Sequence, residues 1–387
     1  MRKQPRFRHL RALTAAWVLF LTPAVLAATP ESGPLAGTPE DRIVAFGDVH
    51  GGFDELRSLL AALGLIDTEL NWQGGRTRLV SLGDLLDRGP DSRRVMDLLM
   101  RLEEQAGAAG GAVHIVPGNH EIMNLTGDLR YVSQAEYAAF ASDEDPQTRR
   151  LAREQYLARA QLEVEAAVAR EADTGVQTAD RGPEDPTITF ERQFPPGYFG
   201  HRAAFAADGR YGSWLLGKPQ VLVLERIAFV HGGLSTAFVG LSIEDHNTAA
   251  AAEIRQLLAL GTQLVGSGQI EPWQDILSAP PLNAEAALPA GLLALRESFQ
   301  FAEDGPSWYR GTAACHPLLE QPRFEAVLAN RGLEKVVMGH TPTFPRQLQT
   351  RFSGRAVLAD TGMYEAYYHG RPAAVVFAGN ETRFLSQ

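Results

Sequence analysis

The feature that most constrains this chain is an arrangement that occurs six times, in which a short, mostly apolar run leads directly into a polar cluster. The six apolar runs are residues 43–46, 79–82, 114–117, 227–230, 336–338 and 356–359. Short apolar runs bounded by glycine predict buried strands. Helical patterns at residues 53–63 and 92–105 lie between several of them. This alternation predicts an α/β fold with covered sheets.

The polar clusters contain the candidate functional residues. Ligands of open α/β sheets bind at the carboxyl ends of strands, and each cluster follows a predicted strand. We therefore expect one rim to gather six side chains, Asp48, His50, Asp84, Asn119, His231 and His340. Any one of them alone would more often be structural. Together they offer carboxylate oxygen, amide oxygen and imidazole nitrogen, a donor set that suits Mn, Fe or Zn.

Two metals need a shared ligand, and Asp84 lies in the richest cluster, so we predict that its carboxylate bridges a metal pair. Arg88 offers a planar fork that matches phosphate oxygens. His120 suits protonation of a leaving group, with Asp87 orienting its ring. Arg310, flanked by an aromatic pair and a glycine, is a second candidate phosphate ligand. The alternative for Arg310 is an ordinary surface arginine.

The N-terminal segment differs from the rest of the chain. Five basic residues within positions 2–11 precede an apolar run that extends to about residue 28 and ends in small residues. This pattern predicts a secretory signal over residues 1–27, a linker at 28–40 and a catalytic domain at 41–387. An uncleaved membrane anchor is the alternative, but the run is short and contains Pro23. We expect a periplasmic or secreted protein without a stable membrane anchor after cleavage.

The body of the chain is acidic. Its 36 basic and 46 acidic residues give a formal charge of −10, and loss of the five leader cations brings this to about −15. Such a surface repels nucleic acid and anionic membranes, so we expect neither as a partner. The single cysteine, Cys315, excludes an internal disulfide. We interpret it as a small core residue.

Two Ala-rich segments, 133–172 and 248–264, predict helices, with a break at Pro146. We assign residues 133–196 to a helical and loop insertion within the domain. It is either a lid over the site or a solvated cover of the scaffold.

Taken together, the motifs resemble those of the calcineurin-like metallophosphoesterases. The strings at 47–51, 83–89, 118–121, 231–233 and 339–340 carry this resemblance. Residues 87–89, 230–233 and 308–311 are similar to the phosphoprotein phosphatase branch. Residues 118–132, 212–216 and 360–363 are similar to the Shewanella-like protein phosphatases. The resemblance covers roughly residues 42–378.

This resemblance implies a four-layer fold, a β-sandwich flanked by helices. It implies that Asp48 and His50 hold a first metal, that Asn119, His231 and His340 hold a second, and that Asp84 bridges them. It further implies that Arg88, Arg310 and Asn119 contact the substrate phosphate and that His120 donates a proton while paired with Asp87. The implied mechanism is direct attack by a metal-bridging hydroxide, with manganese expected and iron or zinc as alternatives.

The leading functional hypothesis is therefore a metal-dependent phosphoric monoester hydrolase acting on phosphoproteins or phosphopeptides. The C-terminal aromatic motif of eukaryotic serine/threonine phosphatases is missing from the sequence, so phosphotyrosine and phosphoserine or phosphothreonine both stay open. A dinucleoside-polyphosphate or other nucleotide hydrolase is the alternative, because residues 87–92 also resemble that group. A metal-binding scaffold protein without catalysis is a third possibility, which the complete ligand set disfavours.

Overall fold

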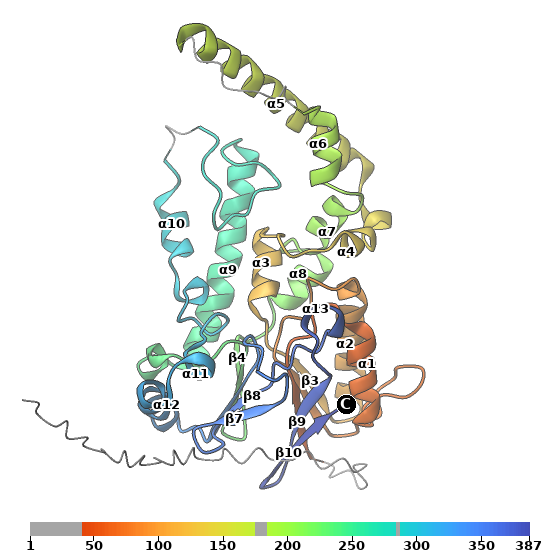
Figure 1. Cartoon of the computed structure of the whole chain (residues 1–387), viewed down its shortest axis with the longest axis vertical. Coiled ribbons are helices and arrows are strands. Elements are labelled where there is room, and N and C mark those ends of the chain that lie inside the picture. Colours follow the sequence, from red (N-terminus) through yellow and green to blue (C-terminus); the bar gives the residue numbers. More distant parts are fainter. Residues whose placement is uncertain (1–40, 175–183, 284–286) are drawn as a thin grey trace, which may run out of the picture.

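The computed structural model describes residues 41–174, 184–283 and 287–387 (Figure 1). The predicted signal at 1–27 and linker at 28–40 lie outside the described residues, and so does the part of the predicted insertion at 175–183. Within the described ranges, no helix combines the length and apolar character needed to cross a membrane.

Two five-stranded sheets form the centre of the molecule, with strand orders β10-β9-β1-β2-β3 and β4-β5-β6-β8-β7. In the first, β1, β2 and β3 are parallel, whereas β9 and β10 are antiparallel additions. In the second, β5, β6 and β8 are parallel, whereas β4 and β7 run antiparallel to their neighbours. The strands are β1 Ile43–Phe46, β2 Arg78–Ser81, β3 Ala112–Ile115, β4 Val221–Leu224, β5 Ile227–Val230, β6 Lys335–Met338, β7 Gln349–Arg351, β8 Ala356–Leu358, β9 Ala373–Ala378 and β10 Glu381–Ser386.

The two sheets pack face to face, and this packing explains why every residue of β1 is apolar. Ile43 and Ala45 belong to the cluster between the sheets, which also contains Phe229 of the second sheet. Val44 and Phe46 belong to the cluster beneath the helices. Successive side chains of a strand point to opposite faces, so a strand covered on both faces must be apolar at every position.

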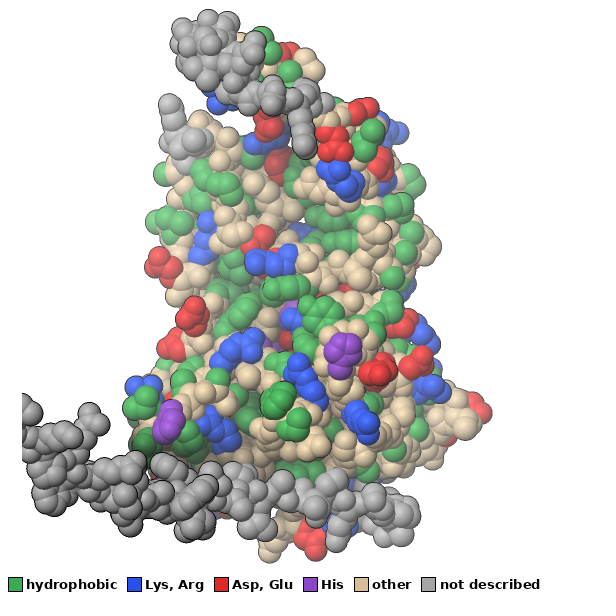
Figure 2. Space-filling model, viewed as in Figure 1, with side chains coloured by type: hydrophobic (Ala, Val, Ile, Leu, Met, Phe, Trp, Pro, Cys, Tyr) green, Lys and Arg blue, Asp and Glu red, His purple; other side chains and the backbone are tan. Residues whose placement is uncertain are grey.

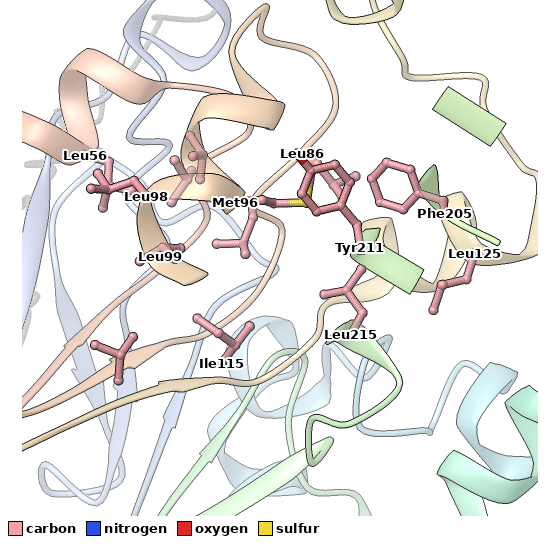
Figure 3. Packing of buried hydrophobic residues seen from close by; sticks show 14 of the residues in the cluster. Leu56, Leu86, Met96, Leu98, Leu99, Ile115, Leu125, Phe205, Tyr211 and Leu215 are labelled. Carbon is pink, nitrogen blue, oxygen red and sulfur yellow. The ribbon is translucent and has the colours of Figure 1, made fainter. Parts of the chain in front are cut away.

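Helices cover both outer faces of this sandwich (Figure 1). On the first sheet, Leu56 of α1 and Leu99 of α2 pack against Ile115 of β3 in one buried cluster (Figure 3). On the second, Phe324 and Leu328 of α12 join a separate cluster. The helices nearest the sandwich are α1 Phe53–Ala62, α2 Ser92–Ala108, α3 Asn119–Thr126, α11 Gly311–Ala314, α12 Pro317–Arg331 and α13 Glu365–Tyr368. The predicted α/β class and its four-layer arrangement are confirmed.

A group of further helices lies above the sheets, and α5 projects away from the body (Figure 1). The predicted break at Pro146 is confirmed, since α4 ends at Ala138 and Pro146 starts α5. Proline is tolerated at this position because the first helical turn does not need the amide that proline lacks. An aromatic cluster that includes Phe190 and Phe194 of this segment packs against Tyr137. The remaining helical elements are α4 Gln134–Ala138, η1 Ala141–Asp143, α5 Pro146–Thr174, α6 Pro186–Gln193, α7 Tyr198–Ala204, α8 Arg210–Leu215, α9 Ile243–Gly266, α10 Ala290–Arg296, η3 Phe299–Phe301 and η2 Thr236–Val239, the last of which packs against α12.

Two sequence expectations need correction. Helix α9 begins five residues before the predicted start at 248, because Ser242 caps it by accepting the amide of Asp245 at 3.3 Å. Cys315 is exposed and not a core residue. It follows the last residue of α11 and directly precedes His316, which caps α12. On the face viewed in Figure 2, acidic and basic side chains are interspersed.

Candidate metal centre and active site

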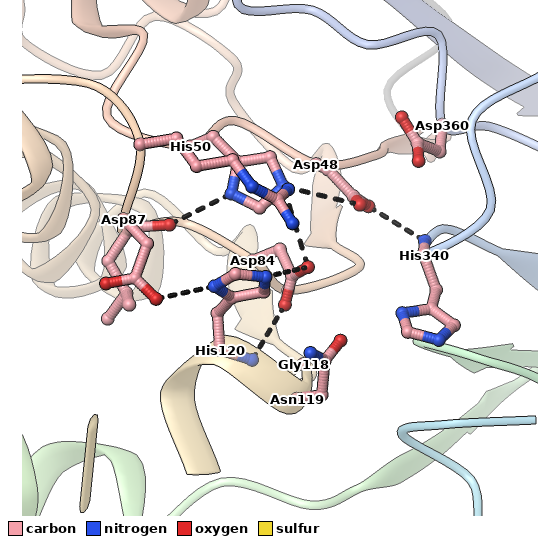
Figure 4. Close-up of polar contacts among 12 residues, drawn as sticks. Asp48, His50, Asp84, Asp87, Gly118, Asn119, His120, His340 and Asp360 are labelled. Carbon is pink, nitrogen blue, oxygen red and sulfur yellow. Dashed lines mark hydrogen bonds and ion pairs between the residues drawn. The ribbon is translucent and has the colours of Figure 1, made fainter. Parts of the chain in front are cut away.

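The predicted metal-ligating residues lie at the carboxyl ends of β1, β2, β5 and β6 and at the start of α3, and Figure 4 shows Asp84 among them. The backbone there is unusual. His50, Asp84, Asp87, Arg88 and His340 all have φ between 49° and 71°. Side chains other than glycine rarely adopt this left-handed conformation, and such strain is typical of functional sites.

One group of ligands surrounds His231, which is fully buried. Its Nδ1 lies 2.6 Å from the Leu82 carbonyl, which can only accept, so Nδ1 carries the proton of the neutral ring and Nε2 carries a lone pair. That Nε2 lies 3.0 Å from Asn119 Oδ1, 3.1 Å from His340 Nδ1 and 3.2 Å from Asp84 Oδ1. Four atoms that can act as metal ligands thus converge, and a divalent ion is the group that would bind all of them at once.

A second group surrounds His50. Its Nδ1 lies 3.0 Å from the Leu86 carbonyl, so its Nε2 likewise faces inward. This nitrogen lies 3.8 Å from Asp48 Oδ2 and 3.6 Å from Asp84 Oδ2. Asp84 therefore turns one oxygen toward each group, the arrangement that a bridging carboxylate requires. The residues present fit two divalent ions.

His120, the predicted proton donor, lies next to one of the two groups of predicted metal ligands. The histidines and carboxylates whose ligand atoms lie within 4.8 Å of one another form two sets in the described structure, His50–Asp84–His120 and Asp84–His231–His340. The structure thus places His120 beside the first set, with Nε2 3.8 Å from Asp84 Oδ2. Its Nδ1 contacts Asp87.

Close backbone approach explains two of the glycines. A Cβ on Gly118 would lie 2.2 Å from Asp84 Oδ1, and one on Gly339 would lie 2.5 Å from Asp48 Oδ1. Either atom would displace a ligand oxygen. Glu121 reinforces the same region, because its buried carboxylate accepts the amides of Asp84 at 2.9 Å, Leu85 at 2.8 Å and Gly118 at 2.6 Å.

His120 and Asp87 form a buried pair. His120 Nδ1 lies 2.5 Å from Asp87 Oδ2, and Asn124 donates to Asp87 Oδ1 at 3.0 Å. Burial lowers the pKa of His120, but the carboxylates of Asp84 and Asp87 outweigh it, so the net shift is upward. The pair thus holds an imidazole whose Nε2 points toward the metal side and can carry a proton.

The electrostatics of the ligands also favour a cation. Burial raises the pKa of Asp48 well above its usual range, and the carboxylates of Asp360 and Asp84 raise it further. Burial lowers the pKa of His340 to about 2, and the neighbouring His231 adds to this effect. A neutral imidazole and crowded carboxylates are the states that a metal ion favours.

A pocket of about 400 Å³ opens above these residues. Its lining includes Asp84, Arg88, Asn119, His120, Met123, Asp128, Arg130, Tyr131, Trp308, Arg310, His340, Pro342, Tyr367 and Tyr368. Arg310 is an exposed residue of this lining, and it donates to the His340 carbonyl at 3.0 Å and to Thr341 Oγ1 at 3.2 Å. Arg88 lies between the rings of Tyr131, Tyr367 and Tyr368, each 5.2 to 5.5 Å from its guanidinium carbon. It also contacts His50 Nε2 and the Tyr368 hydroxyl.

All predicted site residues are thus brought together, and sequence reasoning missed several others. Glu121 and Asn124 lie within residues 118–132, where polar residues in a short helix next to predicted ligands were the available signal, but the sequence alone assigns them no role. Asp360 directly follows the last apolar run at 356–359, yet only the fold shows its carboxylate beside Asp48. Tyr131 lies in the 118–132 string but was given no role, and Tyr368 carried no local signal.

Comparison with known proteins agrees with this geometry. A family model for calcineurin-like phosphoesterases matches residues 41–344. Shewanella-like protein phosphatase 2 of Arabidopsis thaliana is 33% identical over 54% of this chain and 50% of its own length. Shewanella-like protein phosphatase 1 of Plasmodium berghei is 24% identical over 86% of this chain and 69% of its own. This chain therefore spans about half the length of the Arabidopsis relative.

Among solved structures, the cold-active protein-tyrosine phosphatase of a psychrophilic Shewanella species superposes with a TM-score of 0.58. The superposition covers 90% of this chain and 82% of that one, at 22% identity. At that identity the likeness concerns the fold.

Proposed function

The chain belongs to the calcineurin-like phosphoesterase family, and from this premise we propose that it is an exported protein phosphatase that hydrolyses phosphate monoesters with two divalent metal ions. The observation that carries the proposal is the shared orientation of Asp84, whose two oxygens face two separate groups of lone-pair donors beneath one pocket. Next to them lie a buried His–Asp pair and two arginines.

In this proposal Asp48, His50 and Asp84 hold the first ion, and Asp84, Asn119, His231 and His340 hold the second. When bound, such ions neutralise phosphate charge and lower the pKa of a coordinated water, which supplies a nucleophile at neutral pH. The oxygen and nitrogen donors suit manganese, and we propose manganese as the native metal, with iron and zinc as the alternatives.

The remaining steps belong to the side chains of the pocket. Arg310, fixed through the His340 carbonyl, and Arg88, held among tyrosine rings, bind two phosphate oxygens and orient the phosphorus for in-line displacement. Asn119, whose Oδ1 lies 3.0 Å from His231 Nε2 and which lines the pocket, acts as a metal ligand and also contacts the phosphate in this proposal. His120 donates its Nε2 proton to the leaving oxygen, while Asp87 fixes the ring and stabilises its charged form.

The walls of the pocket favour an aromatic leaving group. Tyr131, Tyr367 and Trp308 line it together with Met123, and an aryl phosphate that enters can pack its ring against these faces. The relatives named as protein phosphatases, and the solved structure described as a tyrosine phosphatase, are consistent with this class. We therefore propose phosphotyrosine peptides as better substrates than phosphoserine peptides.

A nucleotide with several phosphates fits less well. Its additional negative charges need cations beyond the metal centre, and the next arginine on the pocket wall, Arg130, is already paired with Asp128 through contacts of 2.7 and 2.6 Å. The acidic surface of the chain adds general repulsion.

A substrate profile tests the proposal. Residues 28–387, loaded with manganese, are assayed on phosphotyrosine, phosphoserine and phosphothreonine peptides and on a dinucleoside polyphosphate. The proposal expects the highest kcat/KM on the phosphotyrosine peptide. Failure on all three peptides, with turnover of the nucleotide, refutes the protein-substrate assignment and leaves the metal centre in place.

Export is a separate part of the proposal and rests on the basic and apolar N-terminal segment. Expression of the full chain in a Gram-negative host, followed by fractionation and N-terminal sequencing, should recover a periplasmic protein that begins near residue 28. Recovery of the intact chain in the membrane fraction would support the anchor alternative.

A further inference from the structure

The turn that carries Asp87 and Arg88 is strained. Their φ angles are 71° and 69°, and a Cβ on the following Gly89 would lie 2.3 Å from the His50 carbonyl oxygen. Two consecutive left-handed residues other than glycine are unfavourable and persist only when the surrounding structure imposes them. The turn carries both the partner of the proton donor and a phosphate-binding arginine, so whatever holds it affects both functions.

The segment at the start of the insertion supplies that support. The amide of Arg88 donates to the Tyr131 carbonyl at 2.9 Å. The hydroxyl of Ser133 donates to the Gly89 carbonyl at 3.2 Å. Two successive residues of the turn are therefore tied to residues 131–133, immediately before α4.

Glu136, in the first turn of α4, completes the support from behind. Its side chain is fully buried, and its carboxyl faces the Ser92 hydroxyl and the backbone amide of Asp87. That same amide donates to Ser92 Oγ at 3.2 Å. The Asp87 amide is therefore held by Ser92, and the Glu136 carboxyl lies beside both groups.

The surroundings of Glu136 make an incidental role costly. His201 of α7 lies 3.8 Å away and is also fully buried. In the described structure, neither carboxyl oxygen of Glu136 and neither ring nitrogen of His201 completes a hydrogen bond of ordinary geometry. A buried polar group without full partners lowers stability. A leucine of similar size would avoid that cost, and it would remove the acceptor that faces the Asp87 amide.

We propose that Glu136 is a positioning residue that holds the 87–89 turn in its left-handed conformation, so that the insertion supports proton donation and phosphate binding from its first helical turn. This inference rests on the proposed function, because it assumes the roles given to His120, Asp87 and Arg88. It assigns α4 a task that neither a lid nor a solvated cover would have.

The test compares Glu136→Leu with Glu136→Gln in the full-length mature protein. Rates are measured on a phosphoserine peptide, which needs a proton donor, and on p-nitrophenyl phosphate, which needs little help. The Leu variant should lose about a hundredfold in kcat on the peptide and about tenfold or less on the aryl ester, because small misplacements of catalytic groups cost on this scale. The Gln variant keeps a carbonyl acceptor, so the ratio of the two rates should stay near that of the wild type.

Glu144 provides the matched control. It belongs to the same insertion, its side chain is 7% exposed, and it accepts the Gly197 amide at 2.6 Å without touching the 87–89 turn. Glu144→Leu should leave the ratio of the two rates unchanged. In an Asp87→Asn background, Glu136→Leu should also leave the ratio unchanged, because the pair through which it acts is already broken.

A readout independent of turnover is amide hydrogen exchange across residues 85–91. Protection there should fall in Glu136→Leu and persist in Glu144→Leu. Should Glu136→Leu fail to fold, Ser92→Ala, which removes the acceptor of the Asp87 amide, must shift the ratio in the same direction. Equal losses on both substrates for Glu136→Leu, with unchanged exchange, overturn the inference while the function stands. A wild-type protein without phosphatase activity on any monoester overturns the function instead.

Discussion

Replacement of His120 by asparagine is the sharpest test of the proposed chemistry. Nδ1 of His120 lies 2.5 Å from Asp87 Oδ2, and Nε2 faces the pocket and the metal side, 3.8 Å from Asp84 Oδ2. Asparagine retains a polar group of smaller size but cannot deliver a proton at neutral pH. The side chain is 2% exposed, so bulk water does not readily take its place.

The size of the loss should depend on the leaving group. A positioned general acid contributes about 10²- to 10⁴-fold, which corresponds to about 3 to 5 kcal/mol of barrier. A serine alkoxide needs the whole of this help. The tyrosine phenolate, whose conjugate acid has a pKa near 10, needs an intermediate share, and p-nitrophenolate needs almost none. We expect losses in kcat that decrease in that order, with the smallest at about tenfold or below.

The assay measures kcat and KM on the two phosphopeptides and on p-nitrophenyl phosphate at saturating manganese, with metal content determined for each variant. His114→Asn is the control, because this histidine lies on β3, outside the pocket lining, near Glu103. A loss of the same factor on all three substrates, with two metals retained, would refute the proton-donor role. It would point instead to His120 as a group that positions the metals.

Three further predictions concern the metals and the pH dependence of stability. Asp84→Asn should weaken both metal sites by more than the roughly 10- to 100-fold typical of outer-shell partners, and retention of two ions at normal affinity by elemental analysis would exclude the bridging role. Chelation should abolish turnover and lower the thermal unfolding midpoint, and adding manganese should restore both. A ligand at about 1,000 times its Kd adds about 4 kcal/mol to the free energy of unfolding. An unchanged midpoint would contradict occupancy of the buried site. Burial lowers the pKa of His246 from 6.5 to about 4, so the unfolded chain takes up its proton first as pH falls below 6.5. The free energy of unfolding should therefore drop by up to about 3 kcal/mol between pH 6.5 and 4, and His246→Gln should flatten this slope in urea titrations if the histidine is responsible.

The sequence alone determined the α/β class, the strand ends that bear the ligands, and the identity of the candidate metal-binding residues. It did so because a strand buried on both faces must be apolar throughout, and because the ligands follow such strands directly along the chain. The edge strands β7 and β10 gave no comparable signal, since their residues are partly exposed and their apolar pattern is broken. The exposed position of Cys315 was missed because residue type alone does not show that this residue lies in the connection between two helices.

The tertiary structure decided the relations between residues that are distant in the chain. Tyr131, Glu136 and Tyr368 meet the 87–89 turn only because α4 and α13 are folded against it. Asp84 faces two ligand groups while its φ is 50°, a left-handed conformation that aspartate tolerates better than most residues but that only the surrounding structure imposes here. Local sequence fixes which groups are available through periodicity and turn chemistry, whereas direction and distance depend on long-range packing that imposes strained conformations at the site.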